Sequence, residues 1–299
     1  MRRRDDVRPR RPAGPGLRPE RAVSLARALS KFGVCSRREA ERLIADGRVR
    51  VGGSTERSPR RRIDPSRDRV TLDGRRVGDD VKRVVIAFHK PVGLVTTRVD
   101  PGGRPTVYDA LSSIPRWVFP VGRLDRDSSG LLILTNDHRL GERLTSPDAH
   151  VPKTYHARVR GVPDAEALRA LREGLPLDDG TLTRPARVHA LGTARGRPAG
   201  SSSLAGPGSS WLEIVLTEGK NRQVRRMGAA LGHEVLELVR VRIGRLGLGT
   251  LAPGEWRELT AAEVAELAGP ERRHGRGSSL GSRTTTAYDS RPSRHGGRR

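Results

Sequence analysis

The chain of 299 residues contains a single cysteine, Cys35, which excludes an internal disulfide bond and any cysteine-rich zinc site. No stretch approaches the roughly 20 apolar residues of a membrane-spanning helix. The arginine-rich start lacks the apolar segment of a signal peptide. We therefore expect a cytoplasmic protein without a membrane partner. Aromatic residues make up only 3% of the chain and apolar residues 34%, so part of the sequence is expected to stay unpacked.

Negative charge is also scarce, because 34 acidic residues oppose 58 basic ones and the net charge is +24. Residues 1–22 carry eight Arg against three acidic residues (+5), and residues 270–299 carry eight against two (+6), which leaves +13 for residues 23–269. Since this central region alone attracts polyanions, nucleic acid is the expected partner, ahead of an anionic membrane surface. The preference for Arg over Lys is attributed first to genomic base composition and second to phosphate binding.

Composition divides the chain into four parts. Residues 1–22 and 270–299 are rich in Arg, Pro, Gly and Ser, and both are predicted to be disordered basic tails. Between them we expect a small module over residues 23–80 and a larger domain over residues 84–268. A flexible insertion is predicted within the larger domain at residues 192–210.

The small module has a clear helical pattern. Apolar residues at helical spacing predict a helix that begins near Leu25 and ends at Gly33. Ser36 and Glu39 have the spacing of a capping box at the start of a second helix, which ends at Gly47. Two short strands with alternating apolar residues follow and complete a helix-helix-strand module.

Three arginines of the second helix, Arg37, Arg38 and Arg42, lie outside its apolar stripe, where they form either a solvated face or an RNA-binding face. The run GVCSRREAERLIADGRVRVGG resembles the alpha-L RNA-binding module of a small-subunit ribosomal protein and of several RNA-modifying enzymes. It departs from that pattern at Gly52, where Asn is usual. The resemblance implies that the three arginines contact RNA.

The larger domain is predicted to be of the α+β class, with a mixed and mostly antiparallel sheet flanked by helices. Strands outnumber helices in its pattern, and several strands are arranged as hairpins. Helices are expected at residues 104–113, 138–145, 164–174, 222–231 and 261–267.

The stretch VGRLDRDSSGLLILTND places Asp125 in a glycine-flanked loop before an apolar strand, where Asp serves either as a turn residue or as a working carboxylate. On the helix expected at residues 222–231, Arg222, Arg225 and Arg226 are predicted to share one face that could hold a carboxylate or a phosphate. A solvated face is the alternative. Tyr155 lies in a strand after the Asp125 loop and is either a core residue or a site residue.

Three blocks, GRLDRDSSGLLILTND, KTYHARVRG and EGKNRQVRRMGAALGHEVLELVRVRIGRLGLGTLAPGEWREL, occur in this order. They resemble the characteristic blocks of the RsuA/RluB-type ribosomal RNA pseudouridine synthases, which carry the alpha-L module at the N-terminus. The resemblance covers residues 23–268 apart from the insertion. It implies that Asp125 is the nucleophile, that Tyr155 packs on the target base and that Arg225 is the basic partner of Asp125. It also implies that Arg123 takes part in base flipping and phosphate contact. Lys220, Arg222 and Arg226 are expected to contact RNA as well.

The implied reaction converts a specific uridine of ribosomal RNA into pseudouridine. Large-subunit ribosomal RNA is the favoured substrate. The glycosidic bond is cut, the uracil turns, and C5 is joined to the ribose, with a carboxylate attacking the anomeric carbon or the uracil ring. An Arg beside a buried carboxylate lowers its pKa by about 1–3 units. The target must also be flipped out and stacked on an aromatic side chain. The sequence contains no metal cluster, Walker loop or dinucleotide fingerprint, and the implied reaction needs neither a metal nor a small-molecule cofactor. We expect a monomer that acts on ribosomal RNA or a pre-ribosomal particle.

Two other functions would use some of the same residues. A non-catalytic, ribosome-associated RNA-binding protein would use the same module and tails, with Asp125 in a structural role. A glycosidase that uses Asp125 and Asp127 is excluded, because two residues of one turn cannot flank a sugar at the roughly 5–9 Å that such enzymes require.

Overall fold

The computed structural model describes residues 22–78, 81–114, 116–192 and 208–269, and no helix within these ranges is long and apolar enough to cross a membrane. Apart from Ala22, the predicted tails lie outside these described ranges. Most of the predicted insertion also lies outside them. Its two ends do not match the prediction, since strands reach Gly192 on one side and begin at Ser209 on the other.

The N-terminal module pairs two helices with small sheets. Its elements are β1 (Val23–Ser24), α1 (Leu25–Lys31), α2 (Arg37–Ala45), β2 (Val49–Val51), β3 (Ser54–Thr55), β4 (Arg62–Ile63), β5 (Val70–Leu72) and β6 (Arg75–Val77). Strands β3, β2, β5 and β6 form one antiparallel sheet, and β1 pairs with β4. The Ser36 hydroxyl accepts a hydrogen bond from Glu39 N at 3.1 Å, as predicted, but the Glu39 carboxylate pairs with Arg42 and so leaves the capping box half formed.

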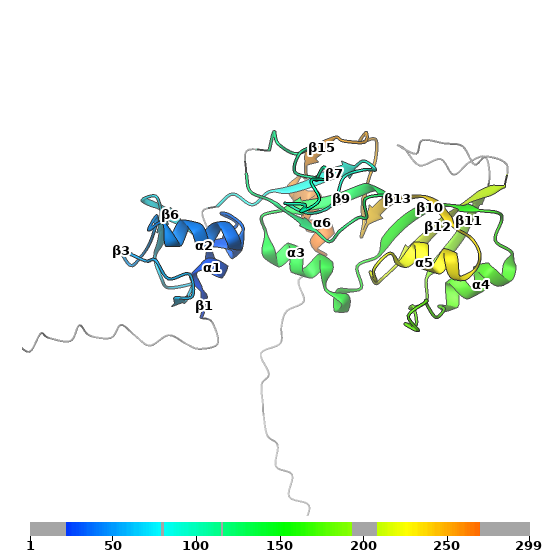
Figure 1. Ribbon diagram of the computed structural model, residues 1–299, viewed down its shortest axis with the longest axis horizontal. Helices are drawn as coiled ribbons and strands as arrows, with labels where there is room; N and C mark the ends of the chain where they lie inside the picture. Colours follow the sequence, from blue (N-terminus) through cyan, green and yellow to red (C-terminus); the bar gives the residue numbers. More distant parts are fainter. Residues whose placement is uncertain (1–21, 79–80, 115, 193–207, 270–299) are drawn as a thin grey trace, which may run out of the picture. The chain divides into compact units, whose positions relative to one another are not determined.

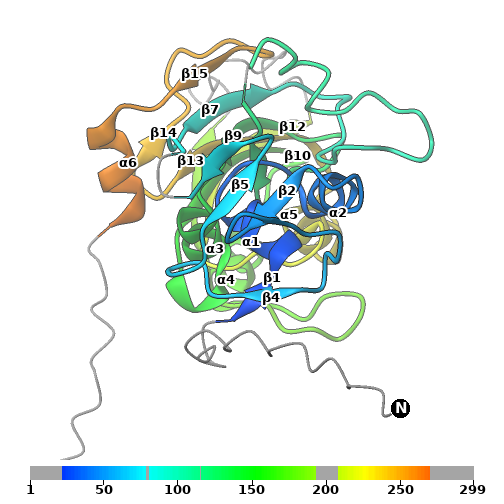
Figure 2. The ribbon, with the colours of Figure 1, turned by 90° about the vertical axis from the view of Figure 1, so that its left-hand side faces the viewer.

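The larger domain is built on one sheet with the strand order β11-β12-β10-β13-β9-β7-β15, and Figure 2 shows the last four of these strands in succession. All of these pairs are antiparallel except β13 with β9, so the predicted α+β class with a mostly antiparallel sheet is confirmed. The strands are β7 (Val85–Lys90), β8 (Phe119–Val121), β9 (Ser129–Thr135), β10 (Lys153–Arg160), β11 (Arg187–Gly192), β12 (Ser209–Leu216), β13 (Val235–Ile243), β14 (Leu246–Gly247) and β15 (Trp256–Glu258).

Four of the five predicted helices of this domain are present: α3 (His138–Thr145), α4 (Ala165–Glu173), α5 (Gln223–Ala230) and α6 (Ala261–Ala268) (Figure 1). The helix predicted at residues 104–113 is wrong. The chain there forms turns, because the Asp109 carboxylate accepts hydrogen bonds from Thr106 N at 2.7 Å and from Thr106 Oγ1 at 3.1 Å. A short 3-10 helix, η1 (Pro147–Ala149), follows α3.

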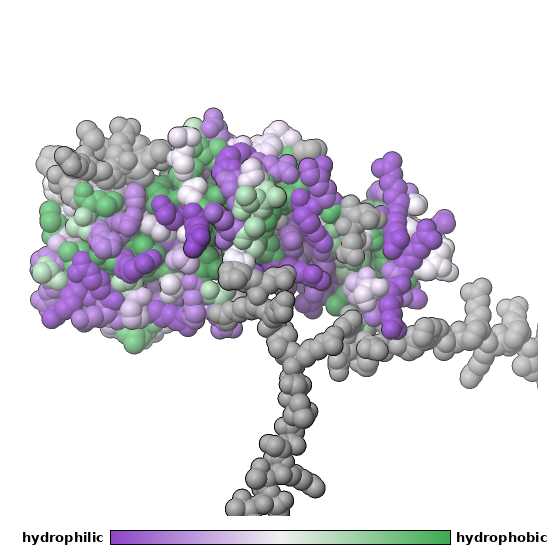
Figure 3. All heavy atoms as spheres, turned by 180° about the vertical axis from the view of Figure 1, so that it is seen from behind, coloured by the Kyte–Doolittle hydropathy of each residue, from purple (hydrophilic) through white to green (hydrophobic). Residues whose placement is uncertain are grey.

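Strand β9 is buried along its whole length, which explains its continuous apolar sequence. Leu131 and Ile133 pack with α3 and α6 on one face of the sheet. Leu132 and Leu134 point to the opposite face and pack with residues of the long connection between β7 and β8. Few large apolar side chains are exposed among the described residues, and Figure 3 shows hydrophilic residues in purple interspersed with apolar ones in green on one face.

Gly130 allows β13 to approach β9 closely. Its φ is +106°, and a Cβ atom there would lie 2.3 Å from the carbonyl oxygen of Arg240 and 2.6 Å from its backbone nitrogen. Arg240 and Gly130 are paired in register between the two strands. Only glycine fits this position, because any side chain would separate the strands directly behind the Asp125 loop.

We predict that Gly130→Ala strongly destabilises the protein. Positive φ alone costs a non-glycine residue about 1–2 kcal/mol, and the overpacking against Arg240 adds roughly 1–3 kcal/mol. The matched control is Gly180→Ala, where φ is +76° and no atom lies within 4 Å of the new Cβ. Urea unfolding of both variants measures the difference, and equal losses of stability would show that the close approach at Gly130 is unimportant.

Candidate active site

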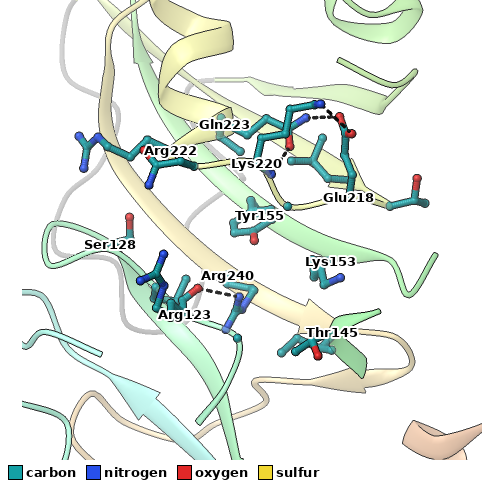
Figure 4. Close-up of a pocket in the computed structure, with 18 of the residues that line it drawn as sticks. Arg123, Ser128, Thr145, Lys153, Tyr155, Glu218, Lys220, Arg222, Gln223 and Arg240 are labelled. Atoms are coloured by element: carbon teal, nitrogen blue, oxygen red, sulfur yellow. Dashed lines mark hydrogen bonds and ion pairs between the residues drawn. The ribbon is translucent and has the colours of Figure 1, made fainter. Parts of the chain in front are cut away.

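A cavity of about 690 Å³ lies where β9, β10 and β13 meet the loop between β12 and α5 (Figure 4). This volume lies within the roughly 300–1,000 Å³ of typical ligand pockets. Cationic side chains outnumber carboxylates around it, so the cavity attracts anions. The six cations are Arg123, Lys153, Arg184, Lys220, Arg222 and Arg240, and the two carboxylates are Asp125 and Glu218.

Asp125 lies in the loop that joins β8 to β9. The loop is fixed by its backbone, since Ser128 N donates to Asp125 O at 3.1 Å and Thr96 Oγ1 donates to Leu124 O at 2.7 Å. The carboxylate itself lines the cavity, and its side chain is 33% exposed. Among the described residues, its polar contact is with Arg222 Nη1 at 3.7 Å. It therefore makes none of the side-chain hydrogen bonds of a turn-stabilising Asp.

Lys90 holds this loop in place through hydrogen bonds from its buried side chain. The fully buried side chain donates from Nζ to Ser128 O at 2.8 Å and to Pro91 O at 3.0 Å. Burial lowers the pKa of Lys90 to about 8, although the nearby Asp127 and Asp125 carboxylates raise it. Lys90 thus joins the end of β7 to the end of the Asp125 loop.

The three arginines around α5 do not share one helix face, contrary to the prediction. Arg222 precedes the helix, with a left-handed backbone (φ +47°). Its guanidinium donates to the two carboxylate oxygens of Asp127 at 3.1 and 3.0 Å. Arg226 turns away and pairs with Asp178 and Asp179.

Arg225 pairs with Asp127, which corrects the expected direct pair with Asp125. Its Nε lies 3.2 Å from Asp127 Oδ2, within ion-pair distance although outside hydrogen-bond geometry. Its Nη2 donates to Asp127 O at 2.8 Å and its Nη1 to Val235 O at 2.8 Å. Arg225 therefore connects the Asp125 loop to β13, while Arg222 is the cation that reaches Asp125.

Tyr155 lies on β10, opposite Arg240 of β13, and lines the cavity. The half-buried ring packs against apolar residues of two core clusters. Figure 4 shows Tyr155 near the centre of the site, with Arg240 and Lys153 around the same space. The arrangement combines both interpretations of Tyr155, because the side chain packs against the core and the residue also lines the cavity.

The other residues assigned to RNA binding occupy different places. Arg123 is exposed at the cavity, and Lys220 lines it with Nζ 3.8 Å from Glu218 Oε2. The exposed residues Arg37, Arg38 and Arg42 belong to α2 of the N-terminal module and do not line the cavity.

Sequence reasoning missed three cations of the cavity: Lys153, Arg184 and Arg240. A signal existed for Lys153, since residues two apart in a strand share a face and Lys153 precedes Tyr155 by two. No such signal exists for Arg240, because its side of the sheet depends on a register shift between β10 and β13. The described residues contain no group of three metal-ligating His, Cys, Asp or Glu side chains.

Comparison with known proteins places this arrangement in a family. Residues 84–230 match the RNA pseudouridylate synthase family and residues 24–70 match the S4 domain. An RNA pseudouridine synthase of Aquifex aeolicus is 40% identical over 246 residues, which cover 82% of this chain and 93% of the relative. Ribosomal large subunit pseudouridine synthase B of Bacillus subtilis is 37% identical over 243 residues, covering 81% and 94%.

A solved structure supports the same assignment. The crystal structure of a pseudouridylate synthase superposes with a TM-score of 0.55 at 27% sequence identity, and the match covers 82% of this chain and 99% of the other. The chain belongs to the RNA pseudouridine synthase family, and it is an isomerase.

We predict that Arg222→Met raises the pKa of Asp127. Burial alone raises that pKa, but the hydrogen bonds from Arg222 and the charges of Arg225 and Arg222 outweigh burial and lower it. Because the folded-state pKa is lowered, this carboxylate stabilises the fold above its ordinary pKa of about 3.9, and the contribution is lost as pH falls below that value.

Carboxyl-carbon NMR over a pH titration measures the change. Arg226→Met is the matched control, because Arg226 pairs with Asp178 and Asp179 and leaves Asp127 untouched. An Asp127 pKa that is the same in wild type and Arg222→Met, or that shifts equally in the control, would contradict the proposed arrangement of charges.

Proposed function

We propose that the protein converts a specific uridine of ribosomal RNA into pseudouridine, with Asp125 as the nucleophile. The observation that carries the proposal is the position of the Asp125 carboxylate, which lines the same cavity as Tyr155 and has Arg222 Nη1 at 3.7 Å. Arg222 is thus the counter-charge beside the carboxylate that is proposed to attack.

The reaction needs only groups that this cavity provides. The bond from uracil N1 to ribose C1′ breaks, a bond from C5 to C1′ forms, and the proton on C5 is lost while N1 gains one, so no oxidant or energy source is consumed. Asp125 attacks either C1′ or the uracil ring. Tyr155 provides the surface on which a flipped uracil stacks, and Arg123, exposed at the entrance, contacts the RNA around it.

Large-subunit ribosomal RNA is the proposed substrate. The support is the similarity to the Bacillus subtilis protein that is named a ribosomal large subunit pseudouridine synthase. Pseudouridine mapping of both ribosomal RNAs, from cells with and without the gene, tests this. Loss of one site in large-subunit RNA is the expected result, and loss of a site only in small-subunit RNA would overturn the choice of subunit.

We predict that Asp125→Asn folds normally but forms no pseudouridine, because the amide keeps the shape and loses the nucleophile. The matched control is Asp164→Asn, the same change at the exposed N-cap of α4, where Asn caps equally well. Single-turnover assays on ribosomal RNA measure the rates. Turnover by pure Asp125→Asn would remove Asp125 from the mechanism, and a wild-type protein that binds RNA without modifying it would favour the non-catalytic alternative.

The S4 domain is proposed to add affinity for RNA through α2. Arg37 and Arg38 are exposed there and no ion pair engages them among the described residues, whereas Arg42 is paired with Glu39. We predict that Arg37→Gln combined with Arg38→Gln weakens RNA binding and reduces the slope of log affinity against log salt by about 0.7–0.9 for each phosphate that is no longer neutralised. Arg42→Gln is the internal comparison and should have the smaller effect. Equal salt slopes for wild type and double variant would contradict this role.

A further inference from the structure

Arg240 has an unused hydrogen-bond donor within the candidate active site. The residue is only 4% exposed and lines the cavity. Its Nε donates to Leu131 O at 2.7 Å and its Nη1 to Arg123 O at 3.5 Å, while the buried Nη2 has no partner among the described residues. A buried donor that lacks a partner costs about 1–3 kcal/mol, so the fold retains it against a measurable penalty.

A register shift aims Arg240 at this cavity. Thr154 pairs with Arg242 but Tyr155 pairs with Arg240, so Val241 is an extra residue in β13. Without this bulge, Val241 would oppose Tyr155 and Arg240 would point to the other face of the sheet. The bulge therefore places a buried guanidinium directly opposite the residue that is proposed to stack on the base.

Lys153 is a second cation without a partner at the same place. It precedes Tyr155 by two residues on β10, so it shares the face of Tyr155 about 7 Å along the strand. The half-buried side chain lines the cavity and makes no hydrogen bond or ion pair with the described residues. Burial lowers the pKa of Lys153, and the positive charge of Arg240 lowers it further, so the two cations repel each other.

The carboxylates around the cavity are engaged elsewhere. Glu218 Oε1 accepts hydrogen bonds from Arg184 N at 2.8 Å and from Gln223 Nε2 at 2.6 Å. Asp125 has Arg222 as its cation. Among the described residues, no carboxylate lies within ion-pair distance of Lys153 or Arg240. A buried guanidinium and a neighbouring half-buried ammonium without a counter-charge fit an anion that arrives with the substrate.

We propose that Lys153 and Arg240 bind the phosphate group directly attached to the flipped uridine, an inference that rests on the proposed function. A phosphate oxygen accepts from the free Nη2 of Arg240 while the Lys153 ammonium neutralises the same group. The base then stacks on Tyr155, which is paired with Arg240 across the strands and follows Lys153 by two residues on β10. The pair fixes the nucleotide relative to Asp125 and favours RNA over a free nucleoside.

The test uses short RNA hairpins that contain the uridine identified by mapping. One hairpin has normal phosphodiesters, and two others carry a neutral methylphosphonate at the 5′ or the 3′ linkage of that uridine. For the wild-type enzyme we expect at least a tenfold loss of single-turnover kcat/KM with one of the two modified hairpins. The hairpin that loses activity identifies whether the 5′ or the 3′ phosphate is bound.

Lys153→Met should lose a similar factor on the normal hairpin and almost nothing more on the sensitive methylphosphonate hairpin, because both changes remove the same interaction. Arg169→Met, an exposed charge on α4 away from the cavity, is the control and should keep the wild-type response. Arg240→Met also removes the bond to Leu131, so its folding is checked by thermal unfolding, and Arg240→Lys provides a second variant that keeps the charge.

The outcomes separate the inference from the function on which it rests. If the wild type converts the normal hairpin and tolerates both methylphosphonates, the phosphate site is wrong while the isomerase activity stands. If Lys153→Met loses the same factor on all three hairpins, the cations act on the base or the ribose and the inference is also overturned. A wild type that forms no pseudouridine in the normal hairpin would instead contradict the proposed function.

Discussion

The geometry of the site depends on the parallel pairing of β9 with β13, which joins the two halves of the large sheet. This pairing is short, with Val239 opposite Ser129 and Arg240 opposite Gly130. On one side lie β7 and β15, with the Asp125 loop leading into β9; on the other side lie β10, β11 and β12, with Tyr155. The proposed nucleophile, Asp125, and the proposed stacking residue, Tyr155, thus come from opposite sides of this junction, and their separation is set where glycine lets the backbones approach.

Polar side-chain contacts also stabilise the junction between β9 and β13. The Asp127 carboxylate accepts a hydrogen bond from Arg222, which is 95 residues away in the sequence. The Asp127 carbonyl accepts one from Arg225, 98 residues away, and Arg225 also donates to Val235 O at the start of β13. The Asp125 loop is thereby fixed to α5 and to β13, while Lys90 fixes it to β7. A loop held at three points can present a carboxylate without using the carboxylate itself as an anchor, which is the requirement for a nucleophile that must stay reactive.

Local patterns in the sequence were sufficient for most of the fold and for part of the site. Helices α1 and α4 follow from their apolar spacing and a terminating glycine, and α6 follows from its capping residues. The position of Asp125 follows from its glycine-flanked loop. The failures have physical reasons. Thr106 and Asp109 close a turn with side-chain hydrogen bonds that compete with a helix.

The positions of the arginines could not be predicted from local sequence patterns, because they depend on the tertiary structure. Arg222 adopts a left-handed conformation before α5, which removes it from the helical periodicity used to place it. The role of Asp127 was overlooked because its partners lie far away in the sequence. Arg240 is hidden for another reason, since one extra residue in β13 reverses the face to which its side chain belongs.

The contacts of Arg222 distinguish the two carboxylates of the loop, Asp125 and Asp127. A carboxylate held by two hydrogen bonds from one guanidinium keeps its negative charge but has fewer lone pairs available for attack. Asp127 takes these bonds, and Arg222 stays 3.7 Å from Asp125, within ion-pair distance and too far for a strong hydrogen bond. The second carboxylate of the loop therefore positions the arginine, and the first keeps an unoccupied oxygen directed at the cavity. If Asp125 is the nucleophile, as proposed, Arg222 can stay beside it without a hydrogen bond that must break when the carboxylate attacks.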